Sequence, residues 1–287
     1  MIFIQFFDQL ESTNKYCELL DLSQTEEFYT VAARSQTAGI GQGTNHWESE
    51  PHRNLTFSTV LKPTFLPVAD QFMITKTISL GLTDWLRKQT TLQHRICIKW
   101  PNDIYVTQCD FPLQTHESPQ SLQQASDISD NYSSISDRKI CGVLTSNHII
   151  GNTLSSCIVG IGLNINQESF SSWIPHPVSL CQLTGQTYLL DACLHTLLSH
   201  IQKRYQQLQT HQWEQINNDY RELLFHRGEE YPYIYKGVPL RATLTDVNRF
   251  GHLMLTDSDG HQLTAELKEL RFVFCEVPRA PYNTIIH

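Results

Sequence analysis

The chain has 287 residues, of which 40% are hydrophobic, and its net charge is −8 at pH 7. This length allows one large domain or two unequal domains with a proper core. The negative charge argues against nucleic acid as the main partner, and no apolar run approaches the ~20 residues that a membrane span needs. We therefore expect a soluble cytoplasmic protein with neither a nucleic-acid nor a membrane partner.

The cysteines and histidines give no firm metal site. The eight cysteines are scattered among apolar neighbours without a Cys-x-x-Cys pair, a pattern that favours buried free thiols over disulfides or zinc. The thirteen histidines show no metal-ligand spacing either. Any anionic ligand must therefore be held by local groups.

The first part of the chain predicts two strands, a short helix and a glycine-rich loop. Ile2 to Phe6 reads as a strand, which leaves no room for an N-terminal DNA-binding module. Ser12, Thr13 and Asn14 then offer caps to a short helix, and capping alone is one interpretation of this trio. After a second strand, Tyr29 to Arg34, the loop 35–47 carries three glycines on alternate residues. Such a loop can form an anion-binding nest, although most are simple connectors.

The stretch from Arg95 to Asp103 combines an apolar strand with polar groups at its end. Ile96, Ile98 and Trp100 alternate on one face, and Lys99 lies on the other. Pro101 stops ladder pairing, so the Asn and Asp that follow sit at a strand end in a fixed geometry. Strand ends are where α/β proteins place their chemistry. An ordinary surface turn is the alternative interpretation.

The composition then changes between residues 107 and 138, where Ser, Gln and Asp dominate without sustained periodicity. We predict a disordered insertion there. Regular structure resumes at Lys139, and an apolar strand leads into Gly160-Ile161-Gly162-Leu163-Asn164. Two glycines on one strand predict close approach of another backbone or of a ligand ring, with tight strand packing as the alternative. Helices follow, and short strands with turns begin near Tyr231.

Four segments in this order resemble the catalytic domain of biotin protein ligases. They are the loop from Gln36 to Trp47, Lys-Trp-Pro-Asn-Asp at 99–103, Lys-x-x-Gly-Val-Leu at 139–144 and Gly-Ile-Gly-Leu-Asn at 160–164. The resemblance runs from about residue 3 to 275. It implies an α+β fold with a mixed-sheet catalytic domain of the class II synthetase-like, biotin/lipoate ligase type at 1–228. A small SH3-like β-barrel at 229–277 and a tail at 278–287 would follow.

The resemblance implies a ligase that makes biotinyl-5′-AMP from biotin and ATP with Mg²⁺. It then transfers biotin to a lysine on the biotin carrier domain of a biotin-dependent carboxylase. The carboxylate of biotin must attack the α-phosphate, and two anions meet only where cations and amides neutralise both. By resemblance, Lys139 is the principal cation and Lys99 supports it. Asp103 would orient a lysine or hold Mg²⁺.

The resemblance also assigns residues to the two ligands. The biotin-binding positions are Ser12, Thr13, Asn14, Gln36, Gly39, Gly41, Gln42, Lys139 and Gly142. The nucleotide-binding positions are Gly41, Gln42, Trp47, Asn102 and Asn164, the last at the position that reads adenine.

Two other functions remain open at this stage. A lipoate or octanoate transferase shares the architecture, although the Trp-Pro-Asn-Asp string favours biotin. A non-catalytic binder of biotin or adenylate is the second, because the glycine-rich loop departs from the pattern of the family. A pure interaction protein would leave the motifs at 99 and 139 without a purpose.

The glycine-rich loop lacks two arginines that the family usually carries, since it reads Gly-Ile-Gly-Gln-Gly-Thr at 39–44. Loss of one such donor typically costs about 2.7 to 4 kcal/mol, or roughly 10²- to 10³-fold in rate. Arg34, His46 and Arg53 are the candidates for a partial substitute. We therefore hypothesise a slow ligase that holds its adenylate loosely. Single-turnover adenylate formation as fast as in an arginine-containing relative would contradict this.

Overall fold

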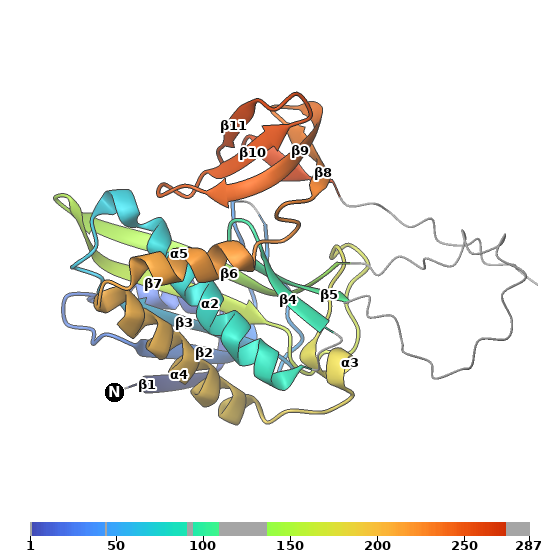
Figure 1. Cartoon of the computed structure of the whole chain (residues 1–287). Helices are drawn as coiled ribbons and strands as arrows, with labels where there is room; N and C mark the ends of the chain where they lie inside the picture. Colours follow the sequence, from blue (N-terminus) through green and yellow to red (C-terminus); the bar gives the residue numbers. More distant parts are fainter. Residues whose placement is uncertain (1, 44, 91–93, 109–136, 274–287) are drawn as a thin grey trace, which may run out of the picture.

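A computed structural model describes residues 2–43, 45–90, 94–108 and 137–273. Its strands form a seven-stranded mixed sheet and a five-stranded antiparallel sheet. Helices cover the large sheet, and the small sheet lies at one end of the molecule (Figure 1). The mixed α+β architecture predicted from the sequence is thus confirmed.

The large sheet has the strand order β1-β2-β3-β7-β6-β5-β4. Its strands are β1 (Phe3–Leu10), β2 (Tyr29–Gln36), β3 (Leu55–Leu61), β4 (His94–Lys99), β5 (Asp103–Gln108), β6 (Arg138–Ile150) and β7 (Thr153–Leu163). β1 and β2 run parallel, and the other neighbouring pairs are antiparallel. β3 is buried along its whole length, because both faces of the sheet are covered at its centre.

Helices cover the two faces of the large sheet unequally. α2 (Phe72–Gln89), α4 (Leu190–Gln209) and α5 (Trp213–Glu222) form the thick layer, and α1 (Thr13–Glu18) packs on the opposite face over β2, β3 and β7. The short helices η1 (Val68–Asp70) and α3 (Leu180–Thr184) complete the set. Within the described ranges, no helix is both long and apolar enough to cross a membrane.

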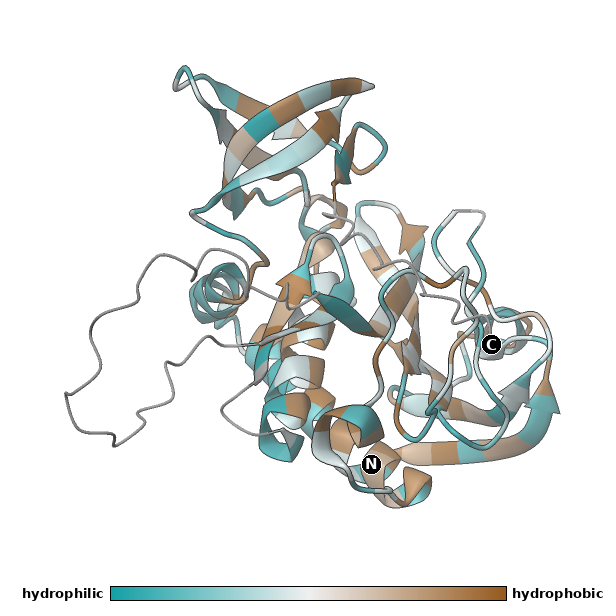
Figure 2. Cartoon of the chain, turned by 90° about the vertical axis from the view of Figure 1, so that its right-hand side faces the viewer, coloured by the Kyte–Doolittle hydropathy of each residue, from teal (hydrophilic) through white to brown (hydrophobic). Residues whose placement is uncertain are grey.

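The small sheet has the strand order β11-β10-β9-β8-β12. Its strands are β8 (Glu230–Tyr235), β9 (Val238–Val247), β10 (Leu253–Asp257), β11 (Gln262–Ala265) and β12 (Leu270–Phe272). Polar and apolar residues alternate along these strands (Figure 2), and the apolar side chains join the same core cluster as the large sheet. The predicted SH3-like barrel is not closed among the described residues, because no ladder joins β11 to β12.

The predicted limits of the insertion, 107–138, were wrong by a few residues. Thr107 and Gln108 still belong to β5, where Thr107 pairs with Arg95, and Arg138 is the first residue of β6. Polar residues at a sheet edge can keep pairing, so composition alone placed the boundaries too far outward. Residues 109–136 of the predicted insertion, and the predicted tail at 278–287, lie outside the described residues.

Lys76 is buried where α2 meets α5 and the end of β9. Its Nζ donates to Asn217 Oδ1 at 2.8 Å and to the carbonyl oxygen of Val247 at 3.4 Å. The ammonium also lies 5.5 Å from the centroid of the Tyr220 ring. Burial lowers the pKa of Lys76 to about 8, and Asp246 opposes this shift. This lysine therefore joins the helical layer to the small sheet at the cost of burying a charge.

Replacing Lys76 by Met should change stability in a pH-dependent way. The folded-state pKa lies below the ordinary value of 10.5, so the unfolded chain binds the proton more tightly. Burying the protonated ammonium lowers the free energy of unfolding. This loss is fully present below about pH 8 and vanishes as the pH rises towards 10.5, the ordinary pKa of lysine. Relative to Lys76→Met, the free energy of unfolding of the wild type should therefore rise by ~1 kcal/mol between about pH 7 and about pH 9.

Urea unfolding of both proteins at the two pH values measures this difference. Buried thiols such as that of Cys97 have a raised pKa, so their contribution makes the free energy of unfolding fall as the pH rises. This contribution is the same in both proteins and cancels in the comparison. Parallel pH curves for the two proteins would contradict the prediction.

Candidate active site

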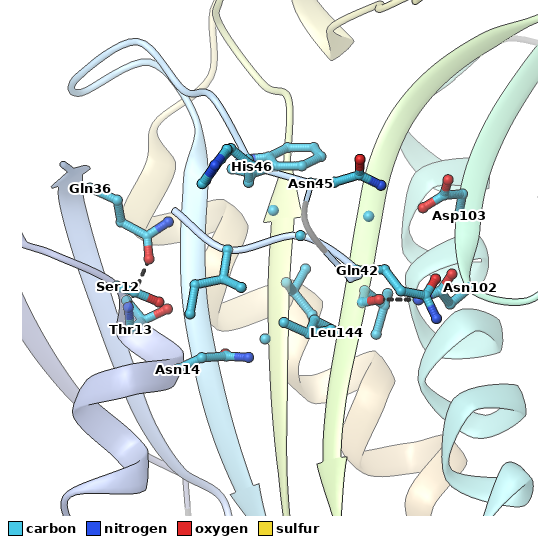
Figure 3. A pocket seen from close by; sticks show the side chains of 18 of the residues that line it. Ser12, Thr13, Asn14, Gln36, Gln42, Asn45, His46, Asn102, Asp103 and Leu144 are labelled. Carbon is cyan, nitrogen blue, oxygen red and sulfur yellow. Dashed lines mark hydrogen bonds between the residues drawn. The ribbon is translucent and has the colours of Figure 1, made fainter. Parts of the chain in front are cut away.

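The three polar residues at the start of α1 are buried and face a cavity. Ser12 occupies the N-cap position but makes no capping hydrogen bond with its side chain. The backbone N–H of Thr13 donates to Gln36 Oε1 at 2.7 Å. Ser58 on β3 donates its hydroxyl to Thr13 Oγ1 at 2.7 Å and also contacts Asn14 Oδ1. Capping therefore does not explain this trio, whose polar atoms form one wall of the cavity (Figure 3).

An ion pair between β5 and β6 stands on the opposite side of the cavity. The register shifts between Ile104 and Tyr105, so that Asp103 lies opposite Gly142 and Tyr105 lies opposite Lys139. Lys139 Nζ is 2.8 Å from Asp103 Oδ2, and the two side chains are 28% and 22% exposed. A Cβ on Gly142 would lie 3.5 Å from both Asp103 Oδ1 and Lys139 Cε. A side chain at position 142 would therefore contact both partners of the ion pair.

The indole of Trp47 lies on a slot formed by two glycines. Gly142 and Gly162 are direct partners across β6 and β7, and a Cβ on Gly162 would overlap the Trp47 ring. A Cβ on Gly160 would likewise overlap the amide of Asn14. The predicted close approach at these glycines is therefore made by side chains of the chain itself. Trp47 Nε1 is buried and has no hydrogen-bond partner among the described residues.

Two cavities meet at this tryptophan and at Lys139. The first, which we call the inner pocket, encloses about 140 Å³. It is lined by Ser12, Thr13, Asn14, Gln36, Ile40, Gly41, Gln42, Asn45, His46, Trp47, Asn102, Asp103, Lys139, Gly142, Val143, Leu144, Gly160, Ile161 and Gly162. Figure 3 shows the α1 residues on one side of it and Asn102 and Asp103 on the other.

The second cavity, which we call the outer pocket, encloses about 230 Å³. It is lined by Asn45, His46, Trp47, Glu48, Lys139, Asn164, Phe170, Trp173, Ile174, Pro175 and Pro177. Asn164 is held in place because its side-chain amide donates to the carbonyl oxygen of Val178 at 3.0 Å. Trp47 and Lys139 line both pockets, so they form the boundary between a polar chamber and a more aromatic one.

Most of the predicted site residues line these pockets, but Lys99 and Gly39 do not. Lys99 is on the edge strand β4, and its Nζ lies 5.5 Å from the Tyr105 ring centroid and 4.9 Å from that of Phe272. Burial lowers the pKa of Lys99, and Asp103 opposes this shift. Lys99 therefore does not line either pocket, although the Lys139 ammonium is close enough to lower its pKa further. Its supporting role beside Lys139 stays a prediction.

Gly39 has a structural position instead. The backbone N–H of Trp47 donates to its carbonyl oxygen at 3.0 Å, and a Cβ there would overlap the carbonyl oxygen of Trp47. The three residues considered as substitutes for the missing loop arginines lie in different places. Arg34 pairs with Asp191 at 2.9 Å and Arg53 lies 3.8 Å from Glu50, whereas His46 lines both pockets.

Sequence reasoning missed several lining residues. Asn45, Val143, Leu144 and Ile161 flank predicted positions, so neighbourhood within a motif could have found them. The segment 170–177 carries no periodicity or motif, and only its aromatic and proline content hinted at a surface for a flat ligand. Of the described residues, Asp257, Asp259 and His261 could group around a metal ion, but they lie at the end of β10 and in the turn after it, and none of them lines either pocket.

Replacing Gly162 by Ala should displace the indole of Trp47. A methyl group there has no room beside the ring, and overpacking of this kind costs about 1 to 3 kcal/mol of unfolding free energy. The cost should largely disappear when Trp47→Ala supplies the background, because the clash is then absent. Denaturant unfolding of the two single variants and the double variant measures this, and additive effects would contradict it.

Comparison with known proteins agrees with this fold. Residues 6–164 match the model of the biotin/lipoate A/B protein ligase family. The bifunctional ligase/repressor BirA of Bacillus spizizenii is 26% identical over 207 residues, which cover 71% of this chain and 54% of that protein. The chain therefore spans about half the length of the curated relatives it matches.

Two solved structures resemble the whole described architecture. The biotin protein ligase of Aquifex aeolicus in complex with biotin and ATP has a TM-score of 0.70 at 19% identity, and the match covers 94% of this chain and 99% of that one. The biotin acetyl coenzyme A carboxylase synthetase of Helicobacter pylori with bound biotinylated ATP has a TM-score of 0.55 at 19% identity, covering 92% and 100%. From its family match over more than half of its length, this chain belongs to the biotin/lipoate A/B protein ligase family.

Proposed function

We propose that this chain is an ATP-dependent biotin protein ligase. It would form biotinyl-5′-AMP and then transfer the biotinyl group to a lysine of a carboxylase's biotin carrier domain. The observation that carries this proposal is the position of Lys139, which lines both the inner and the outer pocket. A cation at the junction of two chambers suits a reaction that joins a carboxylate to a phosphate. The solved relatives named above hold biotin with ATP, or biotinylated ATP.

The inner pocket suits the bicyclic head of biotin. The ureido ring has N–H donors and a carbonyl acceptor, and the buried Ser12 hydroxyl and Asn14 amide, together with the half-buried amide of Gln36, offer both kinds of partner. The carboxylate at the other end of the molecule would then reach Lys139. A pocket with polar groups at its end and apolar walls orients a small ligand in one direction.

The outer pocket suits the nucleotide. Phe170 and Trp173 present aromatic rings, and Asn164 presents an amide at the entrance shared with Trp47. Flat aromatic surfaces stack with a purine, and an amide can read its polar edge. Asp103 places a carboxylate 2.8 Å from the Lys139 ammonium, and one carboxylate together with substrate phosphates is a usual way to hold Mg²⁺. When bound, this ion would offset the charge of the triphosphate.

The two steps then follow from the position of Lys139. In the first, a carboxylate oxygen of biotin attacks the α-phosphorus and pyrophosphate leaves, while the ammonium offsets the charge of both anions. In the second, the unprotonated amine of the target lysine attacks the acyl carbon and AMP leaves. This second step needs positioning above all and no covalent enzyme intermediate.

A lipoate or octanoate transferase is the second candidate, since the family model covers lipoate as well as biotin enzymes. The polar end of the inner pocket favours biotin. An octanoyl chain has no donor or acceptor to offer the buried Ser12 hydroxyl and Asn14 amide, and each buried group left unsatisfied costs about 1 to 3 kcal/mol.

Lys139→Ala should lower the rate of biotinyl-adenylate formation by about 10²-fold or more, because it removes the cation at the junction. Its matched control is Lys203→Ala on the exposed side of α4, which should leave the rate unchanged. Release of pyrophosphate with biotin and Mg-ATP measures this step. Equal rates for Lys139→Ala and the wild type would remove the basis of the mechanism.

The complete reaction is tested by incubating the protein with biotin, Mg-ATP and a biotin carrier domain, and then weighing the carrier. A mass gain of one biotin is the expected result. Labelling with octanoate or lipoate alone would support the acyl transferase, and biotin binding without transfer would support a non-catalytic binder.

A further inference from the structure

A turn of the small sheet packs against the start of α2 and against the β4–β5 hairpin that carries Asp103. This turn, residues 248–252, joins β9 to β10, and Gly251 within it has φ +87°. Arg249 pairs with Asp70 at 2.9 Å, and a Cβ on Gly251 would lie 2.5 Å from the Phe72 ring. A glycine is therefore required here both by its backbone conformation and by the closeness of α2.

Gly251 also contacts the hairpin that carries Asp103. The buried indole of Trp100 donates from Nε1 to the carbonyl oxygen of Gly251 at 2.8 Å. The neighbouring Lys99 ammonium lies 4.9 Å from the Phe272 ring centroid on β12. The small sheet thus contacts two successive residues of the hairpin.

The helical layer holds the next residue of the hairpin. Tyr220 on α5 donates its hydroxyl to the carbonyl oxygen of Pro101 at 3.2 Å. Asn102 and Asp103 follow and turn towards the inner pocket, where Asp103 pairs with Lys139. Residues 99–101 of the hairpin therefore contact the small sheet and α5, whereas Asn102 and Asp103 line the inner pocket.

We propose, on the basis of the function proposed above, that Trp100 and Gly251 are positioning residues for the activation step. Lys99 and Asp103 are direct partners across the hairpin, so a shift of Trp100 moves the Asp103 carboxylate relative to Lys139. The indole cannot shift without leaving a buried hydrogen-bond donor unpaired. The small sheet thereby sets the geometry of the catalytic ion pair through one hydrogen bond, and misplacement by ~1 Å can cost about 10²-fold in rate.

The first test is Trp100→Phe in the whole chain of 287 residues, which keeps an aromatic ring but removes the N–H donor. It should lower kcat of biotinyl-adenylate formation by about tenfold or more, and KM for biotin should change by less than about threefold. Arg249→Ala is the control, because it removes another contact of the same turn without touching the hairpin. It should leave kcat unchanged.

A double-variant cycle separates positioning from general packing. If Trp100 acts through Asp103, then Trp100→Phe should have little further effect on kcat in an Asp103→Asn background. A purely structural role predicts the same fold-change in both backgrounds. Additive effects, or an unchanged kcat in Trp100→Phe, would overturn the inference.

Hydrogen–deuterium exchange gives a readout that does not depend on activity. Gly251→Ala is the second variant, since its Cβ must displace the turn from α2. In Gly251→Ala and Trp100→Phe, the amides of 99–105 should exchange faster, whereas in Arg249→Ala they should not. Unchanged exchange in both overturns the inference, even if neither protein makes adenylate. If the wild type makes no adenylate but the two variants still show the faster exchange, only the proposed function is defeated.

Discussion

The ion pair between Lys139 and Asp103 is the interaction on which the site depends. A lysine ammonium with little exposure needs an opposite charge, because burying an unpaired cation is costly. The shifted register of β5 against β6 supplies that charge from the neighbouring strand. At this level of exposure, the pair adds little to overall stability. Its consequence is that a positive charge stays at the junction of two pockets before any ligand arrives.

The alternation of strand residues explains how one sheet can carry both a core and a pocket. On β7, Val159 and Leu163 belong to the core that packs against the helical layer, whereas Gly160 and Gly162 face the opposite side. Because neighbours along a strand point to opposite faces, glycine on one face removes no apolar side chain from the other. The space left by the glycines admits the side chains of Asn14 and Trp47, which then form walls of the cavity.

The strands and the residues near Lys139 could be predicted because both depend on local sequence. Alternation located the strands within a few residues, and polar groups after an apolar strand marked Asp103. The position of Lys99 could not be predicted in this way. Alternation gives the face on which a side chain begins, but where its ammonium ends depends on Phe272, far along the chain. The outer pocket was missed for a similar reason, since the segment 170–177 has no periodic pattern.

The few positive charges in the two pockets determine how the negative charge of a bound triphosphate could be offset without the loop arginines. Among the described residues that line either pocket, Lys139 is the one lysine or arginine, and Asp103 and Glu48 are acidic. The loop is closed instead by its own backbone, with the N–H of Gly41 donating to the carbonyl oxygen of Asn45 at 2.8 Å. A triphosphate brings more negative charge than one ammonium can offset. If the proposed reaction holds, a divalent cation must therefore carry more of this compensation than in relatives whose loop supplies arginines.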